Sequence, residues 1–236
     1  MQAWQENHLS ILEQSHDENH LFLGLAAIAR GLGFDYCAYG LRSRLPLCRP
    51  KTVLFNNYPV RWQARYQDQD YLSVDPTIEH GMHSLAPIVW PDAPGGKAAA
   101  FWEDARSFGL RVGWAQSSRD TIGTVGMLTL ARSGEPLSDT ELREKCLKMC
   151  WLVHTAHLGM SQRLMARLLP QADTRLSRQE VKVLRWTAEG KTAGDVSDIM
   201  GISERAVNFH IQNAMLKLGA ANKTAAAVRA ALLGII

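Results

Sequence analysis

From Leu176 to Ile236 the sequence reads LSRQEVKVLRWTAEGKTAGDVSDIMGISERAVNFHIQNAMLKLGAANKTAAAVRAALLGII. This stretch carries start and stop signals for short helices. Ser177 and Glu180 form a capping box, in which each side chain satisfies a backbone N–H at the helix start. Gly190 supplies the left-handed end of the same helix. Helical spacing predicts an apolar face made by Val181, Leu184 and Ala188.

Two more helices follow, joined by a very short connection. Thr192 can cap the second helix, which ends at Gly201 after about two turns. Ser203 caps the third helix, so the two must cross sharply through a Gly-containing turn. A fourth helix follows Asn222. The order of these signals predicts an all-α helix-turn-helix domain of four helices.

The third helix carries polar residues away from its apolar stripe. Positions that face outward or lie at the edges hold Arg205, Asn208, Phe209, Gln212 and Asn213. In the major groove of DNA, Arg can bond guanine, Asn and Gln can bond adenine, and an apolar side chain can touch a thymine methyl. Taken alone, the pattern fits an ordinary solvated helix face equally well.

Charge favours DNA as the partner. Residues 174–236 hold nine Lys and Arg against five Asp and Glu, whereas residues 1–173 hold seventeen against eighteen. Phosphate binding requires such local basicity. We expect Arg205 and Asn208 to contact bases. Positions suited to contact the DNA backbone are Lys191, Thr192, Ser203, Lys217 and Lys223.

Three segments of this stretch resemble the DNA-binding domain of LuxR-type transcription regulators. They are LSRQE at 176–180, WTAEGKT at 186–192 and ISERAVNFHI at 202–211. The same domain is also similar to the output module of two-component response regulators. That alternative needs an acidic pair near the N-terminus, a phosphoacceptor Asp after a strand and a later Lys, and the sequence shows no such arrangement.

Length and composition bound the rest of the chain. The 236 residues have room for a domain over 1–165, a linker over 166–175 and a domain over 176–236. With 46% hydrophobic and 21% charged residues, wholesale disorder is excluded.

The sequence shows no signal peptide and no apolar run near the roughly 20 residues of a membrane span, so we expect a cytoplasmic protein without a membrane partner. Cys146 and Cys150 lack a completing ligand set, so no metal site is expected.

The first 165 residues predict mixed α and β structure. An amphipathic helical stretch carrying Leu9, Leu21 and Ile28 ends near Gly33. Strands are expected at Phe34–Leu41, Thr52–Asn56, Gly113–Ser118 and Thr124–Ala131, and helices at Val60–Asp68, Ala98–Phe108 and Ser138–Leu164. The last of these helices should give way at Leu169-Pro170, because Pro cannot continue it.

An aromatic cluster with one acid is the informative feature of this region. Tyr58, Trp62 and Tyr66 lie four residues apart and share one helical face. An aromatic-rich core is the alternative interpretation. Asp75 argues against it, because a carboxylate buried among aromatic rings is costly unless a donor meets it. A bound ligand with an N–H group could be that donor, and without the ligand Asp75 would lack a partner.

The same region resembles the acyl-homoserine-lactone-binding domain of the LuxR family. The segments that carry the resemblance are YPVRWQARY at 58–66, DPT at 75–77, IVW at 88–90 and FWEDARSFGL at 101–110. It implies an α+β chain whose N-terminal domain is an α/β/α sandwich with an antiparallel sheet and a pocket between sheet and helices. It also implies that Asp75 accepts the ligand amide N–H, that Trp62 donates to the lactone carbonyl, and that Tyr58 bonds the amide carbonyl. Thr129 would reach the amide as well.

Further positions are carried over by this resemblance. Trp90 and Phe101 would wall the lactone, with Thr77, Trp102, Ala105 and Leu110 nearby. The acyl tunnel would be lined by Tyr66, Val74, Ala38, Gly40, Leu41 and Met127. Such a ligand has one amide donor, several carbonyl acceptors and an apolar tail, which suits an apolar pocket with few polar groups. The small residues Ala38 and Gly40 favour a medium or long acyl chain.

These observations predict a ligand-responsive transcription regulator of the quorum-sensing type. It would bind an N-acyl homoserine lactone, need no cofactor, and bind a palindromic, lux-box-like double-stranded DNA site as a homodimer. Dimer contacts would come from the helix around Cys146–Leu164 and from the helix after Asn222. RNA polymerase is a further candidate partner. A lactone hydrolase is the remaining alternative, but neither a His-x-His-x-Asp run nor a Gly-x-Ser-x-Gly elbow is present.

Overall fold

The computed structural model describes residues 2–91, 98–120, 123–168 and 174–236, which form two compact units. The first unit is built mainly from residues before Leu164, and the second mainly from residues after it. Positions 169 to 173, where the sequence predicts the helix stop and half of the linker, fall outside the described residues. Each unit has its own hydrophobic core.

A five-stranded antiparallel sheet forms the centre of the first unit. Its strands are β1 (Tyr36–Arg42), β2 (Thr52–Asn56), β3 (Ile88–Val89), β4 (Val112–Arg119) and β5 (Val125–Arg132), in the order β2-β1-β5-β4-β3. Strand β1 pairs with both β2 and β5, although β5 is far from it in the sequence. The chain therefore places β2 at one edge of the sheet and β1 and β5 near its centre.

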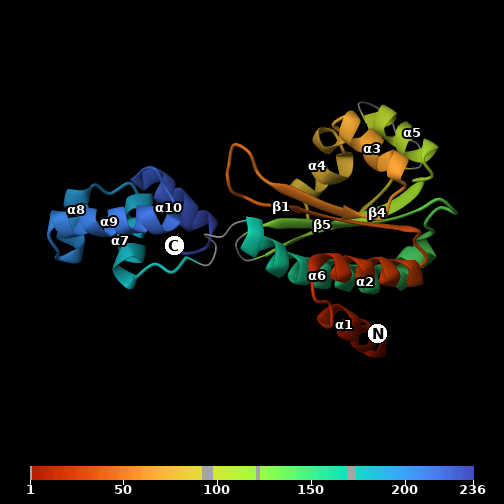
Figure 1. Ribbon diagram of the computed structural model, residues 1–236, viewed down its shortest axis with the longest axis horizontal. Coiled ribbons are helices and arrows are strands. Elements are labelled where there is room, and N and C mark those ends of the chain that lie inside the picture. The colour runs from red at the N-terminus through yellow and green to blue at the C-terminus, as the bar shows by residue number, and fades with distance from the viewer. Residues whose placement is uncertain (1, 92–97, 121–122, 169–173) are drawn as a thin grey trace. The chain divides into compact units, whose positions relative to one another are not determined.

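Helices cover both faces of this sheet. The helices of this unit are α1 (Gln2–Glu13), α2 (Glu18–Gly31), α3 (Val60–Asp68), the short 3-10 helix η1 (Tyr71–Ser73), α4 (Pro76–His83), α5 (Ala99–Ser107) and α6 (Asp139–Leu168), and α1 lies outside the layer formed by α2 and α6. Figure 1 shows α3, α4 and α5 over one face and α2 and α6 over the other. The predicted α/β/α sandwich is confirmed. Among the described residues, no helix, the long α6 included, is apolar enough over a sufficient length to cross a bilayer.

Some elements differ from the expectation. The N-terminal stretch is two helices, because Asp17 accepts a hydrogen bond from the backbone N–H of His20 and starts α2 anew. Helix α4 is not expected from the aromatic pattern, although Asp75 as N-cap and Pro76 in the first turn are usual start signals. Strand β3 is too short for a readable alternation. Helix α6 continues to Leu168, into the range expected for the linker.

The second unit consists of α7 (Arg178–Ala188), α8 (Ala193–Met200), α9 (Glu204–Leu218) and α10 (Lys223–Leu232). A polar side chain caps the N-terminus of each helix, and these residues are Ser177, Thr192, Ser203 and Asn222. Gly201 ends α8 with a left-handed φ of 64°. The predicted caps and stops of the helix-turn-helix are confirmed.

One predicted face in this unit is wrong. Ala188 is exposed, and Val183 is fully buried next to Leu184. Val183 packs with residues of α8 and α9, whereas Leu184 packs with residues of α9 and α10. Because α7 has neighbours on two sides, its buried face is centred on these adjacent residues and not on one stripe at helical spacing.

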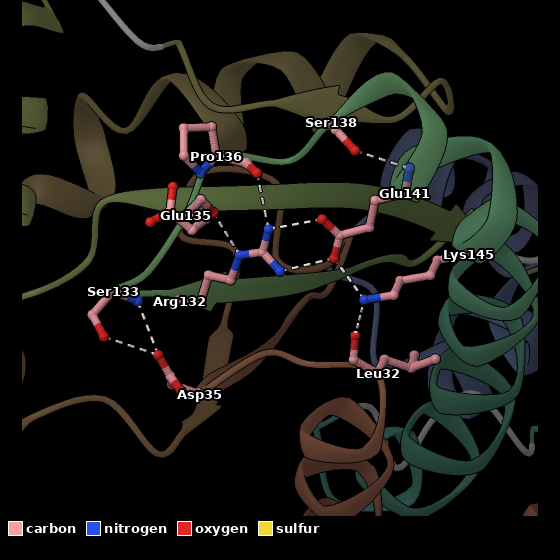
Figure 2. A network of polar contacts seen from close by, with 9 residues as sticks. All are labelled: Leu32, Asp35, Arg132, Ser133, Glu135, Pro136, Ser138, Glu141 and Lys145. Atoms are coloured by element: carbon pink, nitrogen blue, oxygen red, sulfur yellow. Dashed lines mark hydrogen bonds and ion pairs between the residues drawn. The ribbon is translucent and has the colours of Figure 1, made fainter.

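A polar network fixes the start of α6 to the end of β5 (Figure 2). The Arg132 guanidinium donates two hydrogen bonds of 2.8 Å to the carboxylate of Glu141. Lys145 lies one turn further along α6. Its ammonium donates to the same carboxylate at 2.6 Å and to the carbonyl oxygen of Leu32, which follows α2, at 2.6 Å. The network therefore links strand β5 of the sheet to the helix α6 and to the end of α2, which lie over the same face of the sheet.

This network predicts acid sensitivity. The hydrogen bonds from Arg132, followed by those from Lys145, lower the pKa of Glu141 from 4.5 to about 2. Because the folded-state pKa is the lower one, the pair stabilises the protein above pH 4.5, and this contribution is lost as pH falls toward 2. The Glu141 side chain is only 19% exposed, so we expect Glu141→Gln to lower the unfolding free energy by about 2–3 kcal/mol at neutral pH.

Urea unfolding at about pH 7 and about pH 3 measures both effects. Glu144→Gln, at an exposed position of α6, is the matched control and should leave the unfolding free energy nearly unchanged. The assignment fails if Glu141→Gln loses as much stability on acidification as the unsubstituted protein.

Candidate functional sites

A cavity of about 230 Å³ lies between the sheet and the helices α3, α4 and α5. Its floor comes from β1, β2 and β5. Most of the ligand-binding positions expected from the sequence border this cavity: Ala38, Gly40, Leu41, Tyr58, Trp62, Tyr66, Asp75, Thr77, Trp90, Phe101, Ala105, Leu110, Met127 and Thr129. The fold thus brings together residues from segments that are remote in sequence.

The floor of the cavity is a grid of directly paired residues. Paired residues of antiparallel strands point to the same face, so alternate positions of β2, β1 and β5 form rows across the sheet. The inner row is Asn56-Ala38-Thr129, the middle row is Leu54-Gly40-Met127, and the outer row is Thr52-Arg42-Val125; every member borders the cavity. Ala38 and Gly40 lie at the centre of the inner and middle rows, where their small size leaves room above the sheet.

Asp75 borders the cavity as the N-cap of α4. Its Oδ1 accepts hydrogen bonds from the backbone N–H of Thr77 at 2.8 Å and from the Thr77 hydroxyl at 2.7 Å, and its Oδ2 accepts from the Tyr66 hydroxyl at 2.9 Å. Burial raises the pKa of the Asp75 carboxyl, and the hydrogen bonds from Thr77 oppose this rise. The expectation that Asp75 lacks a partner without a ligand is wrong, because the helix cap and Tyr66 supply donors.

Polar groups at one end of the cavity are free, and the buried indole N–H of Trp90, which also borders the cavity, has no partner among the described residues. The hydroxyls of Tyr58 and Thr129 and the indole N–H of Trp62 make no hydrogen bond with any residue that the structure describes. Burial raises the pKa of Tyr58, so its hydroxyl keeps its proton and can donate. The backbone N–H of Tyr58 donates to Oδ1 of Asn56 at 3.2 Å, which places Tyr58 beside the inner row. Unused hydrogen-bonding groups therefore gather at this end of the cavity.

Aromatic rings pack against one another beside the cavity, and all of them except that of Tyr71 border it. They belong to Trp62, Tyr66, Tyr71 and Phe101, with centroid distances from 5.2 to 6.4 Å. Tyr71 does not belong to the expected site, yet its hydroxyl donates to Asp104 at 2.6 Å, and Arg65 pairs with the same carboxylate at 2.6 Å. These bonds lower the pKa of Asp104 and hold α3, η1 and α5 together.

Trp90 forms another wall of the cavity and lies flat against the sheet at Gly113. A Cβ at Gly113 would lie 2.7 Å from Cε3 of Trp90 and nearer still to Cδ2 and Cε2. Only glycine therefore leaves room for this ring. Trp102 was expected to border the ligand, but it packs against Trp90 with ring centroids 5.1 Å apart and does not reach the cavity.

The outer end of the cavity differs from the expectation. Val74 does not border it and is 56% exposed, since it follows η1 on the outside of the unit. The residues that border the cavity in addition to the expected ones include Arg42, Thr52, Leu54, Gln67, Leu72, Met82 and Val125. The two-residue alternation was the available signal for Thr52 and Leu54 on β2, and it also connects Arg42 on β1 with the expected Ala38 and Gly40.

Helix α9 presents the polar face expected from the sequence. Arg205, Asn208, Phe209 and Gln212 are exposed, and Asn213 is partly buried. The buried stripe consists of Val207, Ile211, Ala214 and Leu218. The side chains of Arg205, Asn208 and Gln212 make no hydrogen bond within the described residues, so their hydrogen-bonding groups are available to a partner.

The positions expected at the DNA backbone fall into two groups. Lys191 and Lys223 are exposed and border a groove between α7 and α10. The hydroxyls of Thr192 and Ser203 serve as helix caps. Lys217 has an internal partner, because its ammonium lies 2.9 and 2.8 Å from the two carboxylate oxygens of the buried Glu180. The ammonium of Lys217, expected at the DNA backbone, is therefore already paired within the domain.

Comparison with known families assigns a role to each unit. Residues 17–160 match the autoinducer binding domain, and residues 174–230 match the bacterial regulatory proteins of the luxR family. The chain belongs to the LuxR family. Its two units are thus an autoinducer-binding domain with a small-molecule cavity and a helix-turn-helix domain that binds DNA.

Individual LuxR-family proteins resemble this chain over its whole length. It is 48% identical to the transcriptional activator protein AnoR of Acinetobacter nosocomialis over 100% of both chains. It is 37% identical to the HTH-type quorum-sensing regulator RhlR of Pseudomonas aeruginosa, over 99% of this chain and 96% of RhlR. Its structure is similar to that of Escherichia coli SdiA in complex with octanoyl-rac-glycerol, with a TM-score of 0.84 and 32% identity over 99% of this chain and 95% of SdiA.

Membership of the LuxR family decides between the function classes. AnoR is a transcriptional activator and RhlR is a quorum-sensing regulator, and this chain, as a member of the same family of regulatory proteins, is a regulator and not a lactone hydrolase. The autoinducer-binding domain, in place of a phosphoacceptor domain, separates it from the response regulators. Within the described ranges, no three His, Cys, Asp or Glu side chains gather where they could hold a metal ion.

Proposed function

We propose that this LuxR-family regulator binds an N-acyl homoserine lactone within residues 1–165 and a palindromic DNA site through residues 176–236, with residues 166–175 as the linker. One observation carries the choice of ligand. The free polar groups of Tyr58, Trp62 and Thr129 lie at one end of the cavity, and a channel floored by small residues leads away from them. A ligand with a polar head and a flexible apolar tail fits this arrangement, because the head can bond the free polar groups and the tail can fill the channel.

Each polar group has a role in the proposed complex. A carboxylate offers about four lone-pair sites, and the bonds from Thr77 and Tyr66 leave Asp75 able to accept the ligand amide N–H. Trp62 donates to the lactone carbonyl and Tyr58 to the amide carbonyl, while Thr129 reaches the amide from the sheet. Trp90 and Phe101, with Ala105 and Leu110, wall the lactone ring. Ala38 and Gly40 leave space for a medium or long acyl chain.

Thermal melting with and without lactone tests the choice of ligand. A ligand at 100 times its dissociation constant should stabilise the folded protein by about 2.7 kcal/mol through mass action. The octanoyl and dodecanoyl lactones should raise the melting temperature, and their ring-opened forms, which place a carboxylate where the lactone carbonyl meets Trp62, should raise it less. Unchanged melting across a panel of acyl chain lengths would rule out the lactone.

The proposed homodimer is supported by apolar side chains that the single chain leaves exposed. Leu147 and Leu158 on α6 are 69% and 56% exposed, and Val228 on α10 is 38% exposed. A recognition helix reads few base pairs, so two copies related by two-fold symmetry would read a palindrome. We assign the dimer contacts to α6 around Cys146–Leu164 and to α10.

Substitutions on α9 and in the turn between α7 and α8 should separate base contacts from backbone contacts. Arg205→Ala should cost about 1–3 kcal/mol of binding and relax the preference at one base pair in each half-site. Lys191→Ala should weaken binding to all sequences alike and flatten the salt dependence. Gel shifts with a symmetric operator, an operator with one half-site scrambled and a salt series measure both. Equal affinity for the two operators would contradict the dimer.

A further inference from the structure

Two of the three residues in the outer row of the cavity floor are polar, in contrast to the middle row. Thr52, Arg42 and Val125 form this row, with Arg42 at its centre. Arg42 is partly buried and borders the cavity, yet it makes no hydrogen bond or ion pair with any residue that the structure describes. The hydroxyl of Thr52 is likewise unused. The Arg42 guanidinium and the Thr52 hydroxyl therefore lie at the end of the channel with no acceptor among the described residues.

This end of the cavity reaches solvent. Thr52 and Leu54 on the edge strand β2 are exposed, as is Leu72 of η1, and all three border the cavity. A charged or hydroxyl group at the outer row would keep part of its hydration while it accepts hydrogen bonds. The desolvation cost that excludes ions from a closed apolar pocket is therefore small here.

The distance between the two polar ends sets the length of a ligand that reaches both. Thr129 pairs with Ala38, and Val125 pairs with Arg42, so the inner and outer rows are four residues apart along both strands. That separation is about 14 Å. An extended carbon chain advances roughly 1.25 Å per bond, so about eleven bonds lead from a group at Thr129 to one at Arg42.

We propose that this cavity takes a ligand that is polar at both ends, an N-acyl homoserine lactone whose chain of about ten carbons carries a terminal oxygen, a carboxylate above all, bound by Arg42 and Thr52. The guanidinium presents paired donors that match a carboxylate, and charge-assisted hydrogen bonds of this kind are the stronger ones. The inference rests on the proposed lactone function and specifies the chemistry of the acyl terminus.

Three lactones of equal length test this inference on the full-length protein. They are the N-decanoyl, the N-ω-hydroxydecanoyl and the N-ω-carboxynonanoyl homoserine lactones. Equilibrium titration gives the dissociation constant of each, and the ratio between the alkyl and the carboxylate lactone is the readout. In the unsubstituted protein we expect the carboxylate lactone to bind at least as tightly as the alkyl lactone.

Variants of the outer row should move this ratio. Arg42→Met keeps the approximate side-chain length and removes the charge. It should weaken binding of the carboxylate lactone relative to the alkyl lactone at least tenfold. Arg42→Lys keeps the charge and should retain most of the affinity for the carboxylate lactone. Thr52→Val should lower the relative affinity of the hydroxyl lactone about threefold. Arg61→Met, at an exposed position of α3 that does not border the cavity, is the matched control and should leave the ratio unchanged.

The outcomes separate the two proposals. If the alkyl lactone binds but the unsubstituted protein prefers it to the carboxylate lactone, or if Arg42→Met leaves the ratio as it was, the inference about the terminus is wrong and the lactone function stands. If none of the three lactones binds, the proposed function falls and this inference with it.

Discussion

Asp75→Ala should lower the affinity for the lactone by at least an order of magnitude and the free energy of unfolding by at least about 3 kcal/mol. The substitution removes the N-cap of α4, which is worth about 1 kcal/mol. It also leaves the hydroxyls of Tyr66 and Thr77 without their acceptor, at roughly 1–3 kcal/mol for each group that stays buried. The ligand amide loses its acceptor at the same time, so binding and folding should fail together.

A second substitution separates these two roles of Asp75. Asp75→Asn keeps a side-chain oxygen that can cap α4, so we expect a smaller loss of unfolding free energy than with alanine. The asparagine side chain has no negative charge, and its NH2 group would face other donors, the Tyr66 hydroxyl or the ligand amide N–H. The lactone affinity should therefore still fall. Asp68→Ala at an exposed position of α3 is the control. Reporter dose–response curves and urea unfolding at equal protein levels measure both effects, and wild-type sensitivity of Asp75→Ala would show that the anchor is misassigned.

Gly113→Ala should disrupt the cavity without touching a polar group. A single methyl at this position of β4 would overlap the ring of Trp90, which is itself held by a hydrogen bond of 2.8 Å from its backbone N–H to the carbonyl oxygen of Gly113. The indole must move away from the sheet and into the space proposed for the lactone ring. Overpacking of this kind costs about 1–3 kcal/mol of unfolding free energy, and we expect at least a tenfold loss of lactone affinity.

Two variants make this prediction specific. Gly31→Ala adds the same methyl at the end of α2, where no atom lies within 4 Å, and should leave stability and binding nearly unchanged. Adding Trp90→Leu to Gly113→Ala should recover part of the lost unfolding free energy, because the smaller side chain can move aside. If Gly113→Ala melts like the unsubstituted protein and binds the lactone as tightly, the ring does not depend on this glycine.

Much of this protein could be predicted from its sequence, because many of its features depend on interactions between residues close together in the chain. The caps at Ser177, Thr192 and Ser203 need only groups within three residues of each other, so the helix-turn-helix could be predicted element by element. The exposed face of α9 follows from helical period alone. In the same way, the spacing of Tyr58, Trp62 and Tyr66 predicts α3 with its aromatic side.

The sequence was less informative where two neighbours compete for one element. Periodicity finds a single stripe on α7, but the helix packs on two sides and buries Val183 in place of Ala188. The start signals of α4 were present at Asp75 and Pro76. They were assigned to the ligand because a carboxylate near aromatic residues has more than one explanation until its donors are known.

The sequence by itself determined the helix-turn-helix, the order of most elements in the sandwich and the residue types of a polar-headed ligand site. Only the tertiary structure decided that Glu180 holds Lys217, that Trp90 rests on Gly113, and that Arg42 stands beside Thr52 and Val125 at the open end of the cavity. Caps and helical faces depend on bonds within one or two turns, which the order of residues fixes directly. Partners across a sheet or between helices depend on strand register and packing, and these are set only when the whole domain has folded.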